Sequence, residues 1–321
     1  MPFGFGFAWC EDGRHRHLSS AERQIEGEGL GDPSTVKKES VAPLPGLPPG
    51  FELELPGRGK TFYREKKGPD GAPTLLLLHG WTATADLNWF TCFDALSENF
   101  NVIALDLRGH GRGIRTKSNF KLEDCADDVA ALADQLGIAT FIPVGYSMGG
   151  TIAQLVWQRH EARVRGIVLC STASHFVESR EEKLSFFGLT GLAALSRLTT
   201  AQARTWLTDQ IYLQRKSNGL SPWAIQQIAS HDWRHILEAG SAIGSFDSRE
   251  WLPTLEAPAS VVITTEDGVV APDRQTELYR LVDDVEVFEV HGGHNAVFAK
   301  KDIFVPTLVE ACISVFVRST R

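Results

Sequence analysis

Six short runs of consecutive apolar residues alternate with segments of helical periodicity in the second and later parts of the chain. The apolar runs are residues 74–80, 101–107, 140–145, 166–172, 260–265 and 285–290. A strand that helices cover on both faces reads as a continuous apolar run, which is typical of parallel sheets. The helical patterns between the runs are residues 122–136, 148–159, 273–281 and 305–317. This alternation predicts right-handed crossovers and an α/β fold.

Two strands of a different kind precede these runs. The segments "FELEL" (51–55) and "TFYREKK" (61–67) flank the turn signal "PGRG" (56–59) and predict a β-hairpin. Together with the apolar runs, they predict a mostly parallel, doubly wound central sheet of about eight strands.

One interval, residues 175–250, breaks the alternation, because it contains three successive helical patterns and no strand pattern. The first presents Leu184, Phe187, Leu195 and Leu198 on one face, the second covers 200–213, and the third opens with Ser221 and Pro222 as N-cap and first helical residue. We expect a helical lid inserted into a core of residues 51–174 and 251–321. Such a lid lies above the carboxyl edge of the sheet, where ligands bind in open α/β folds.

The first 50 residues differ from the rest. They carry mixed charges and end in the proline-rich "VAPLPGLPPG" (41–50), which blocks regular backbone hydrogen bonding. We expect a tail or linker that is poorly ordered. An arm that packs against the lid is the alternative, because Phe3, Phe5, Phe7 and Trp9 give the segment apolar surface to bury.

Composition narrows the class of protein. A chain of 321 residues with 43% hydrophobic content can bury a large core, and a net charge of −8 without a basic run argues against a nucleic-acid surface. No stretch of about 18 uncharged apolar residues could span a bilayer, and the N-terminus lacks the basic region of a signal peptide. The five cysteines are widely separated and have no metal-binding spacing. We therefore expect a cytoplasmic protein without a metal or cofactor.

The segment "GYSMG" (145–149) follows a predicted strand and opens a predicted helix, and it matches G-x-S-x-G. At such a sharp turn Ser147 is pushed out above the sheet, and the glycines leave room for backbone that approaches closely. The backbone N–H of Met148 lies at a helix N-terminus, where it can donate to a developing oxyanion. The pattern predicts that Ser147 is a nucleophile.

In this context residues 57–318 resemble the α/β-hydrolase superfamily, and three further stretches match that family. "HGW" (79–81) implies that the Trp81 N–H completes the oxyanion hole, with His79 as a scaffold residue. "TTEDGVVAP" (264–272) resembles the acid loop, which implies Asp267 as the catalytic acid and Glu266 as the second choice. "VHGGHNAVF" (290–298) implies His294 as the catalytic histidine and a structural His291.

The resemblance extends to "LDLRGHGRG" (105–113), which is similar to the family's structural D-x-R-G-x-G-x-S turn. Gly113 stands where the family has serine, so we expect one local hydrogen bond to be missing. His110 is expected to be structural. The segment "HDWRH" (231–235) sets two histidines four residues apart on one helical face, but it lacks a third ligand and the glutamate of H-E-x-x-H, so we expect no metal site.

These residue types fit acyl transfer, because a serine hydroxyl needs an imidazole to take its proton and a carboxylate to fix the imidazole tautomer. We expect a carboxylesterase-like serine hydrolase that cleaves an ester of a small or medium apolar substrate through an acyl-enzyme. A carbon–carbon bond hydrolase of a ring-cleavage pathway, a thioesterase and a non-enzymatic ligand receptor with this fold remain alternatives. Epoxide and haloalkane hydrolases of this family carry Asp where this chain has Ser147, so these two activities are disfavoured. The lid offers candidate pocket walls at Leu184, Phe186, Phe187, Leu189, Trp206, Trp223 and Trp233.

Overall fold

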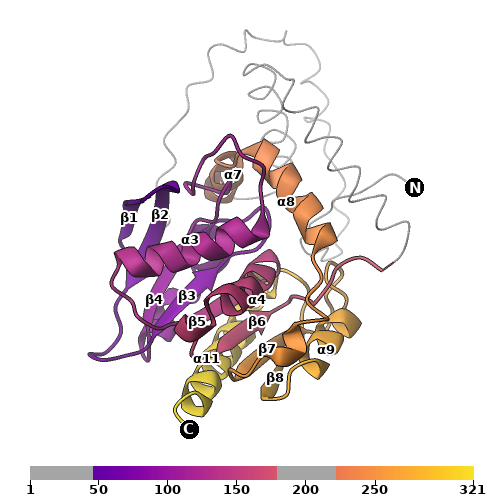
Figure 1. Cartoon of the computed structure of the whole chain (residues 1–321). Helices are drawn as coiled ribbons and strands as arrows, with labels where there is room; N and C mark the ends of the chain where they lie inside the picture. The colour runs from indigo at the N-terminus through magenta and orange to yellow at the C-terminus, as the bar shows by residue number, and fades with distance from the viewer. Residues whose placement is uncertain (1–45, 179–221) are drawn as a thin grey trace, which may run out of the picture. The chain divides into compact units, whose positions relative to one another are not determined.

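The computed structural model describes residues 46–178 and 222–321, which form an eight-stranded sheet with helices on both faces (Figure 1). The strand order is β1-β2-β4-β3-β5-β6-β7-β8. The predicted hairpin is confirmed as β1 (Gly50–Leu55) and β2 (Gly59–Lys66), and β2 pairs antiparallel with β4 (Asn101–Leu105). The parallel part contains β4 and the five strands β3 (Thr74–Leu78), β5 (Ile142–Tyr146), β6 (Ile167–Cys170), β7 (Ala259–Thr264) and β8 (Val285–Val290).

The sheet is doubly wound, as predicted. One face is covered by α3 (Leu122–Gln135), α4 (Met148–His160) and α9 (Pro272–Arg280), and the other by α1 (Ala85–Trp89), α2 (Phe93–Ser97), α10 (Ala296–Ala299) and α11 (Lys301–Arg318). Leu76 and Leu78 of β3 belong to the apolar cluster on the first face, whereas Leu75 and Leu77 belong to the cluster on the second. Because both faces are buried, the four positions after Thr74 are all leucine.

The helices α1 and α2 were absent from the sequence-based expectation, because five residues are too few for a visible helical period. A local signal exists for α1 all the same. Thr84 caps the helix, and its hydroxyl oxygen accepts a hydrogen bond from the Leu87 N–H at 3.0 Å.

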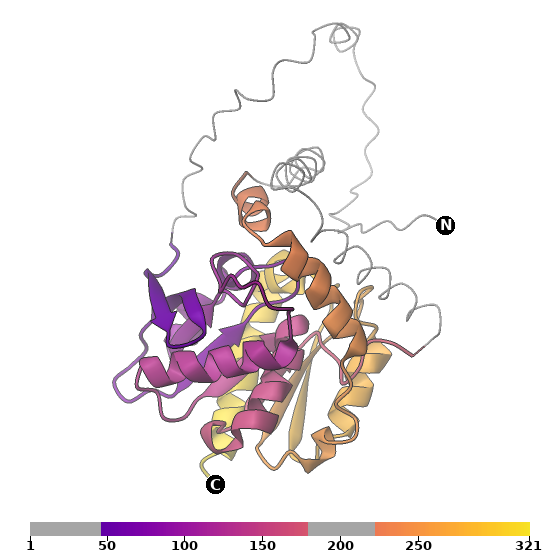
Figure 2. The same cartoon turned by 45° about the horizontal axis from the view of Figure 1, so that its top comes forward.

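The described part of the predicted lid consists of the helices α7 (Pro222–Ala229) and α8 (Trp233–Ser245), with α7 beginning at the predicted proline. Both helices lie at the end of the sheet domain opposite the C-terminus of the chain in the two views (Figures 1 and 2). Ala239 and Ile243 of α8 join the apolar cluster of α3 and α4. The two earlier helical patterns of the interval, Ser221 and residues 1–45 of the predicted tail lie outside the described residues.

Residues 46–49 fall within the predicted tail, yet they contact the core. Leu47 packs against the apolar cluster beneath α11, and the Pro48 carbonyl accepts a hydrogen bond from Arg64 at 2.6 Å. In the ranges that the structure describes, no helix has both the length and the apolar composition that a membrane span requires.

The register aligns the carboxyl ends of the central strands. Leu78 of β3 pairs with Gly145 of β5, and Tyr146 of β5 pairs with Cys170 of β6. The loops that follow β3, β5, β7 and β8 therefore start at a common edge of the sheet. These four loops carry the residues that the sequence singles out.

Candidate active site

Ser147 is the turn residue between β5 and α4, and its backbone is strained, with φ of 54° and ψ of −119°. Its N–H donates to the Cys170 carbonyl at 2.9 Å, and its carbonyl accepts from the Gly150 N–H and the Thr172 hydroxyl, each at 2.8 Å. A non-glycine residue persists in such a conformation only where its surroundings hold it there. These bonds fix the predicted strand-to-helix turn.

The glycines of the motif are required by close backbone approach. A Cβ on Gly145 would lie 2.2 Å from the Gly149 carbonyl oxygen, and a Cβ on Gly149 would lie 2.0 Å from the Leu78 carbonyl oxygen. No side chain fits at either distance, which confirms the steric role that the sequence assigns to these glycines.

The structure brings Ser147, His294 and Asp267 together from three different loops. The Ser147 Oγ lies 3.0 Å from the His294 Nε2, and the His294 Nδ1 lies 2.8 Å from an Asp267 carboxylate oxygen, Oδ2. The Asp267 side chain is fully buried and the His294 side chain is 14% exposed. The arrangement has the geometry of a nucleophile, a base and a group that orients the base.

Asp267 is held by four further donors. Its Oδ1 accepts from the Val269 and Val270 N–H groups at 2.8 and 2.9 Å, and its Oδ2 accepts from the Thr264 hydroxyl at 2.7 Å. Gln275 lies at the same oxygen, 3.4 Å away. Burial alone would raise the pKa of Asp267, but the hydrogen bonds and charge of His294 and the bonds from Thr264 and Val270 outweigh it and lower that pKa. The carboxylate is therefore ionised and accepts a hydrogen bond from His294 Nδ1.

Glu266, the second choice for the acid, points elsewhere. Its side chain is 56% exposed and lies 3.2 Å from the ring of His291, which is also exposed. The structure places Asp267, not Glu266, against His294.

Trp81 and Met148 carry the two N–H groups that the sequence predicts for an oxyanion hole. A Cβ on Gly80 would lie 3.5 Å from the Ser147 Cβ, so the chain entering Trp81 passes directly beside the serine. Met148 is the first residue of α4, and the N–H groups of a first helical turn have no acceptor within their helix. Gly80, which precedes Trp81, and Met148 are thus both neighbours of Ser147.

His79 is a scaffold residue, as the sequence predicts. It is fully buried, its Nδ1 donates to the Gly80 carbonyl at 2.8 Å, and its Nε2 accepts from the Leu107 N–H at 2.9 Å. Burial lowers its pKa, so the ring is neutral and both nitrogens are occupied.

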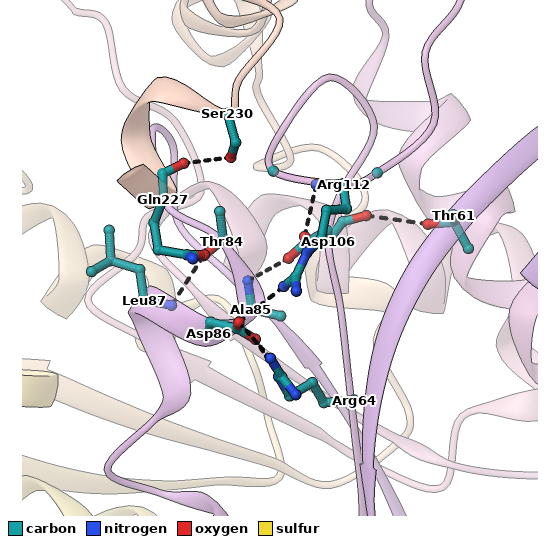
Figure 3. Close-up of polar contacts among 12 residues, drawn as sticks. Thr61, Arg64, Thr84, Ala85, Asp86, Leu87, Asp106, Arg112, Gln227 and Ser230 are labelled. Carbon is teal, nitrogen blue, oxygen red and sulfur yellow. Dashed lines mark hydrogen bonds and ion pairs between the residues drawn. The ribbon is translucent and has the colours of Figure 1, made fainter. Parts of the chain in front are cut away.

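Asp106 fixes the turn that follows β4. Its carboxylate accepts hydrogen bonds from the Ala85 and Arg112 N–H groups, both at 2.8 Å, and so joins the start of α1 to this turn (Figure 3). A Cβ on Gly113 would lie 2.3 Å from the Leu107 carbonyl oxygen. This close approach excludes the family's serine and explains the departure at Gly113.

His110, in the same turn, is buried and bonds through Nδ1 to the Arg108 carbonyl at 2.9 Å. Burial lowers its pKa well below the ordinary value, with nearby His79 adding to the effect. The expected structural role is confirmed.

The expectation for "HDWRH" is wrong in one respect. Because Asp232 is the N-cap of α8, His231 precedes the helix and does not share a helical face with His235. The His231 ring instead bonds to Gly111 and Thr82, and the His235 ring lies 3.2 Å from the Ser118 carbonyl. The two histidines have separate partners.

One other cluster in the described ranges brings together groups that ligate metals. His175 Nε2 lies 3.0 Å from Glu178 and 3.9 Å from Glu277. The hydrogen bond from His175 and the charge of Arg274 lower the pKa of Glu178. The Glu178 carboxylate thus already faces a cationic side chain of the protein, and we assign no metal there.

Two of the candidate pocket walls can be placed. Trp223 of α7 packs edge-on against Phe90 at 5.6 Å between ring centroids, and Trp233 lies 6.1 Å from the His231 ring. Leu184, Phe186, Phe187, Leu189 and Trp206 lie outside the described residues.

The fold and the site agree with comparisons to known proteins. The family model for the alpha/beta hydrolase fold matches residues 73–301. The chain belongs to the alpha/beta hydrolase fold family. The match spans β3 to the start of α11 and includes every residue of the candidate site.

Relatives within the alpha/beta hydrolase family include enzymes. The chain is 26% identical to the AB hydrolase superfamily protein YisY of Bacillus subtilis, over 75% of this chain and 91% of that protein. It is 24% identical to a pyrrolizixenacetamide deacetylase of Xenorhabdus hominickii, over 73% of this chain and 88% of the relative. The crystal structure of the enol-lactonase from Burkholderia xenovorans LB400 superimposes with a TM-score of 0.64 and 25% identity, covering 82% of this chain and all of that one. These relatives support a hydrolytic activity.

Proposed function

We propose that the protein is a serine hydrolase that cleaves a carboxylic ester of a small or medium apolar substrate through an acyl-enzyme. The observation that carries the proposal is the continuous hydrogen-bonded series Ser147–His294–Asp267, with distances of 3.0 and 2.8 Å. Ser147 and Asp267 are 120 positions apart in the sequence, and Asp267 and His294 are 27 apart. The three side chains nevertheless lie within hydrogen-bonding distance of one another in series at one edge of the sheet.

In the proposed reaction the Ser147 Oγ attacks the ester carbonyl carbon while His294 Nε2 takes the serine proton. The Trp81 and Met148 N–H groups donate to the oxyanion of the tetrahedral intermediate, and loss of one such donor costs about 3 kcal/mol of barrier stabilisation. The intermediate collapses as His294 returns the proton to the leaving alcohol. A water molecule then attacks the acyl-serine by the same route, which releases the acid and regenerates Ser147.

An ester is the favoured substrate class because the enol-lactonase among the relatives acts, by its name, on an internal ester. The deacetylase among them removes an acetyl group, which is also acyl transfer. Hydrolases that cleave carbon–carbon bonds or thioesters use the same three types of residue, so these residues alone do not distinguish the three reactions. The substrate test below does.

Labelling with a fluorophosphonate probe tests the nucleophile. The wild-type protein is expected to form a covalent adduct at Ser147, located by peptide mass spectrometry, and Ser147→Ala is expected to form none. Folded wild-type protein that takes up no probe would refute the enzyme proposal and favour a ligand receptor with this fold.

Substrate class is tested with a panel of p-nitrophenyl esters of increasing chain length, alongside acyl thioesters and a ring-cleavage dienoate. The proposal expects turnover of short or medium esters. Turnover of the dienoate alone would assign carbon–carbon hydrolysis, and a strong preference for thioesters would assign a thioesterase.

A further inference from the structure

The loop that follows β3 is bonded at three points to the segment that contains α7 and α8. The Trp81 Nε1 donates to the Ile236 carbonyl at 2.8 Å, the Thr82 carbonyl lies 3.0 Å from the His231 Nε2, and the Thr84 hydroxyl donates to the Gln227 amide oxygen at 2.8 Å. Figure 3 shows the last of these bonds above the start of α1. As the residue numbers of the loop rise, those of their partners fall, so the two segments lie antiparallel along their contact.

Thr82 is the unusual residue of this loop. Its φ of 59° is in the left-handed region, which is an outlier for a β-branched residue and costs about 1–3 kcal/mol. The loop turns back on itself here, since the Ala83 N–H donates to the Gly80 carbonyl at 3.3 Å. Thr82 directly follows Trp81, so its conformation sets the direction of the peptide groups beside the proposed oxyanion donor.

His231 holds Thr82 in this conformation, and His231 is itself fixed. Its Nδ1 accepts from the Gly111 N–H at 3.0 Å, which places the ring proton on Nε2, where it is donated to the Thr82 carbonyl. The ring is buried and packs against the rings of His110 and Trp233, at 5.3 and 6.1 Å. Gly111 belongs to the turn held by Asp106, so His231 connects that turn to the loop of Trp81.

We propose that His231 is a positioning residue for the oxyanion hole, which it serves by fixing Thr82 and thereby the direction of the Trp81 N–H. The inference rests on the proposed function, because it takes Trp81 as an oxyanion donor. It adds a residue from the α7–α8 segment to a site otherwise built by the loops of the sheet. In this proposal His231 acts on the oxyanion hole through Thr82 and not on the reacting atoms themselves.

Two substitutions of similar size separate the two bonds of His231. His231→Asn puts a side-chain oxygen near the Nδ1 position, so it keeps an acceptor for Gly111 but is too short to reach Thr82. His231→Gln reaches the Nε2 position and keeps a donor for Thr82, at the expense of the bond from Gly111. Both variants lose one hydrogen bond at the same buried position, so we expect similar losses of thermal stability.

The readouts are kcat and KM for p-nitrophenyl acetate and the inhibition constant of a trifluoromethyl ketone, whose adduct with Ser147 carries an oxyanion. For His231→Asn we expect kcat to fall about tenfold and KM to change little. The fall is smaller than the loss of about a hundredfold or more that follows complete removal of one oxyanion-hole donor, because the Trp81 N–H is misdirected and not removed. The inhibition constant of the ketone should rise by the same factor. His231→Gln should keep kcat and the inhibition constant within about threefold of wild type.

Equal kcat values for the Asn and Gln variants would overturn the inference, as would an unchanged ketone affinity in His231→Asn. His235→Gln, at a buried histidine of the same segment that bonds to Ser118 and not to the loop, is the control and should leave kcat unchanged. Failure of the proposed function gives a different result, because wild-type protein would then neither turn over the ester nor bind the ketone.

Discussion

The Tyr146 hydroxyl donates a hydrogen bond to the main-chain carbonyl of His294 at 2.7 Å. Tyr146 is the last residue of β5 and immediately precedes the proposed nucleophile, so one bond ties the strand that presents Ser147 to the loop that presents its base. The two rings also pack at 5.6 Å between centroids. Burial raises the pKa of the Tyr146 hydroxyl, which keeps its proton and remains a donor.

Tyr146→Phe should therefore loosen the His294 loop without removing the ring packing. We expect a loss of about 1–2 kcal/mol in the free energy of unfolding, because a partly buried carbonyl loses its donor. The kcat should fall while KM stays near the wild-type value, since the change affects the placement of the base rather than substrate binding. Urea denaturation and steady-state kinetics measure both effects.

The control for this variant is Tyr63→Phe, at a buried tyrosine on β2, three strands away from β5 in the sheet. Its kcat should not change. A Tyr146→Phe protein with wild-type kcat would mean that the hydroxyl stabilises the fold without positioning His294.

Asp267→Asn is expected to reverse the tautomer of His294. The Oδ1 position faces two N–H donors, from Val269 and Val270, so the amide oxygen of asparagine belongs there and its NH₂ group must face His294 Nδ1. The ring then accepts at Nδ1 and carries its proton on Nε2, where it cannot take the proton of Ser147. A loss in kcat on the order of 10⁴ is expected, measured with a p-nitrophenyl ester.

Glu266→Gln is the matched control, since it makes the same chemical change at the neighbouring exposed carboxylate. It should leave kcat near the wild-type value. A large loss in Glu266→Gln with little effect of Asp267→Asn would exchange the roles of the two residues.

The lowered pKa of Asp267 also predicts how stability depends on pH. An aspartate in the unfolded chain has a pKa of about 3.9, so a group with a lower pKa in the folded state contributes stability that is fully present above about pH 4. That contribution disappears as the pH falls through the folded-state pKa. The difference in unfolding free energy between wild type and Asp267→Asn should therefore be smaller well below about pH 4 than above it. Urea denaturation at a series of pH values measures it, and a difference that stays the same as the pH falls below about 4 would contradict the prediction.

The strands of this fold could be predicted because burial on both faces makes them continuous apolar runs, but their ends could not. The runs at 74–80 and 101–107 each extend two residues beyond the strand. Leu107 is buried although its N–H bonds to the His79 ring rather than to a neighbouring strand. A run of apolar residues indicates burial, whereas a strand also needs backbone pairing with a neighbouring strand. Where the chain turns at the edge of the sheet, residues can be buried without such pairing.

The same distinction applies to the site. The contact between Ser147 and His294 could be predicted because the roles proposed for them require particular residue types in a recognisable local pattern. Thr264 and Tyr146 could not, because a threonine or tyrosine has many uses and their partners depend on the register between strands. The helical spacing of His231 and His235 was misleading, although Asp232 carried a correct signal as an N-cap residue.

The Arg108–Asp128 ion pair, which ties the turn after β4 to α3, provides the last prediction. Arg108 donates two hydrogen bonds to Asp128, at 2.9 and 2.7 Å, and both side chains are less than 10% exposed. Burial raises the pKa of Asp128 despite the opposing effects of Arg108 and Arg58, so desolvation already disfavours its charge. Arg108→Met should lower the free energy of unfolding by about 3 kcal/mol, because it leaves a buried carboxylate without its main partner.

The double variant Arg108→Met with Asp128→Leu should recover most of that loss, since apolar side chains of similar volume replace buried ion pairs at little net cost. Arg58, the other partner of Asp128, has a side chain that is 24% exposed and can turn its charge to water. Urea denaturation of the two single variants and the double variant completes the cycle. Additive losses would mean that the two charges do not depend on each other, and that the turn is held instead by the Asp106 bonds to Ala85 and Arg112.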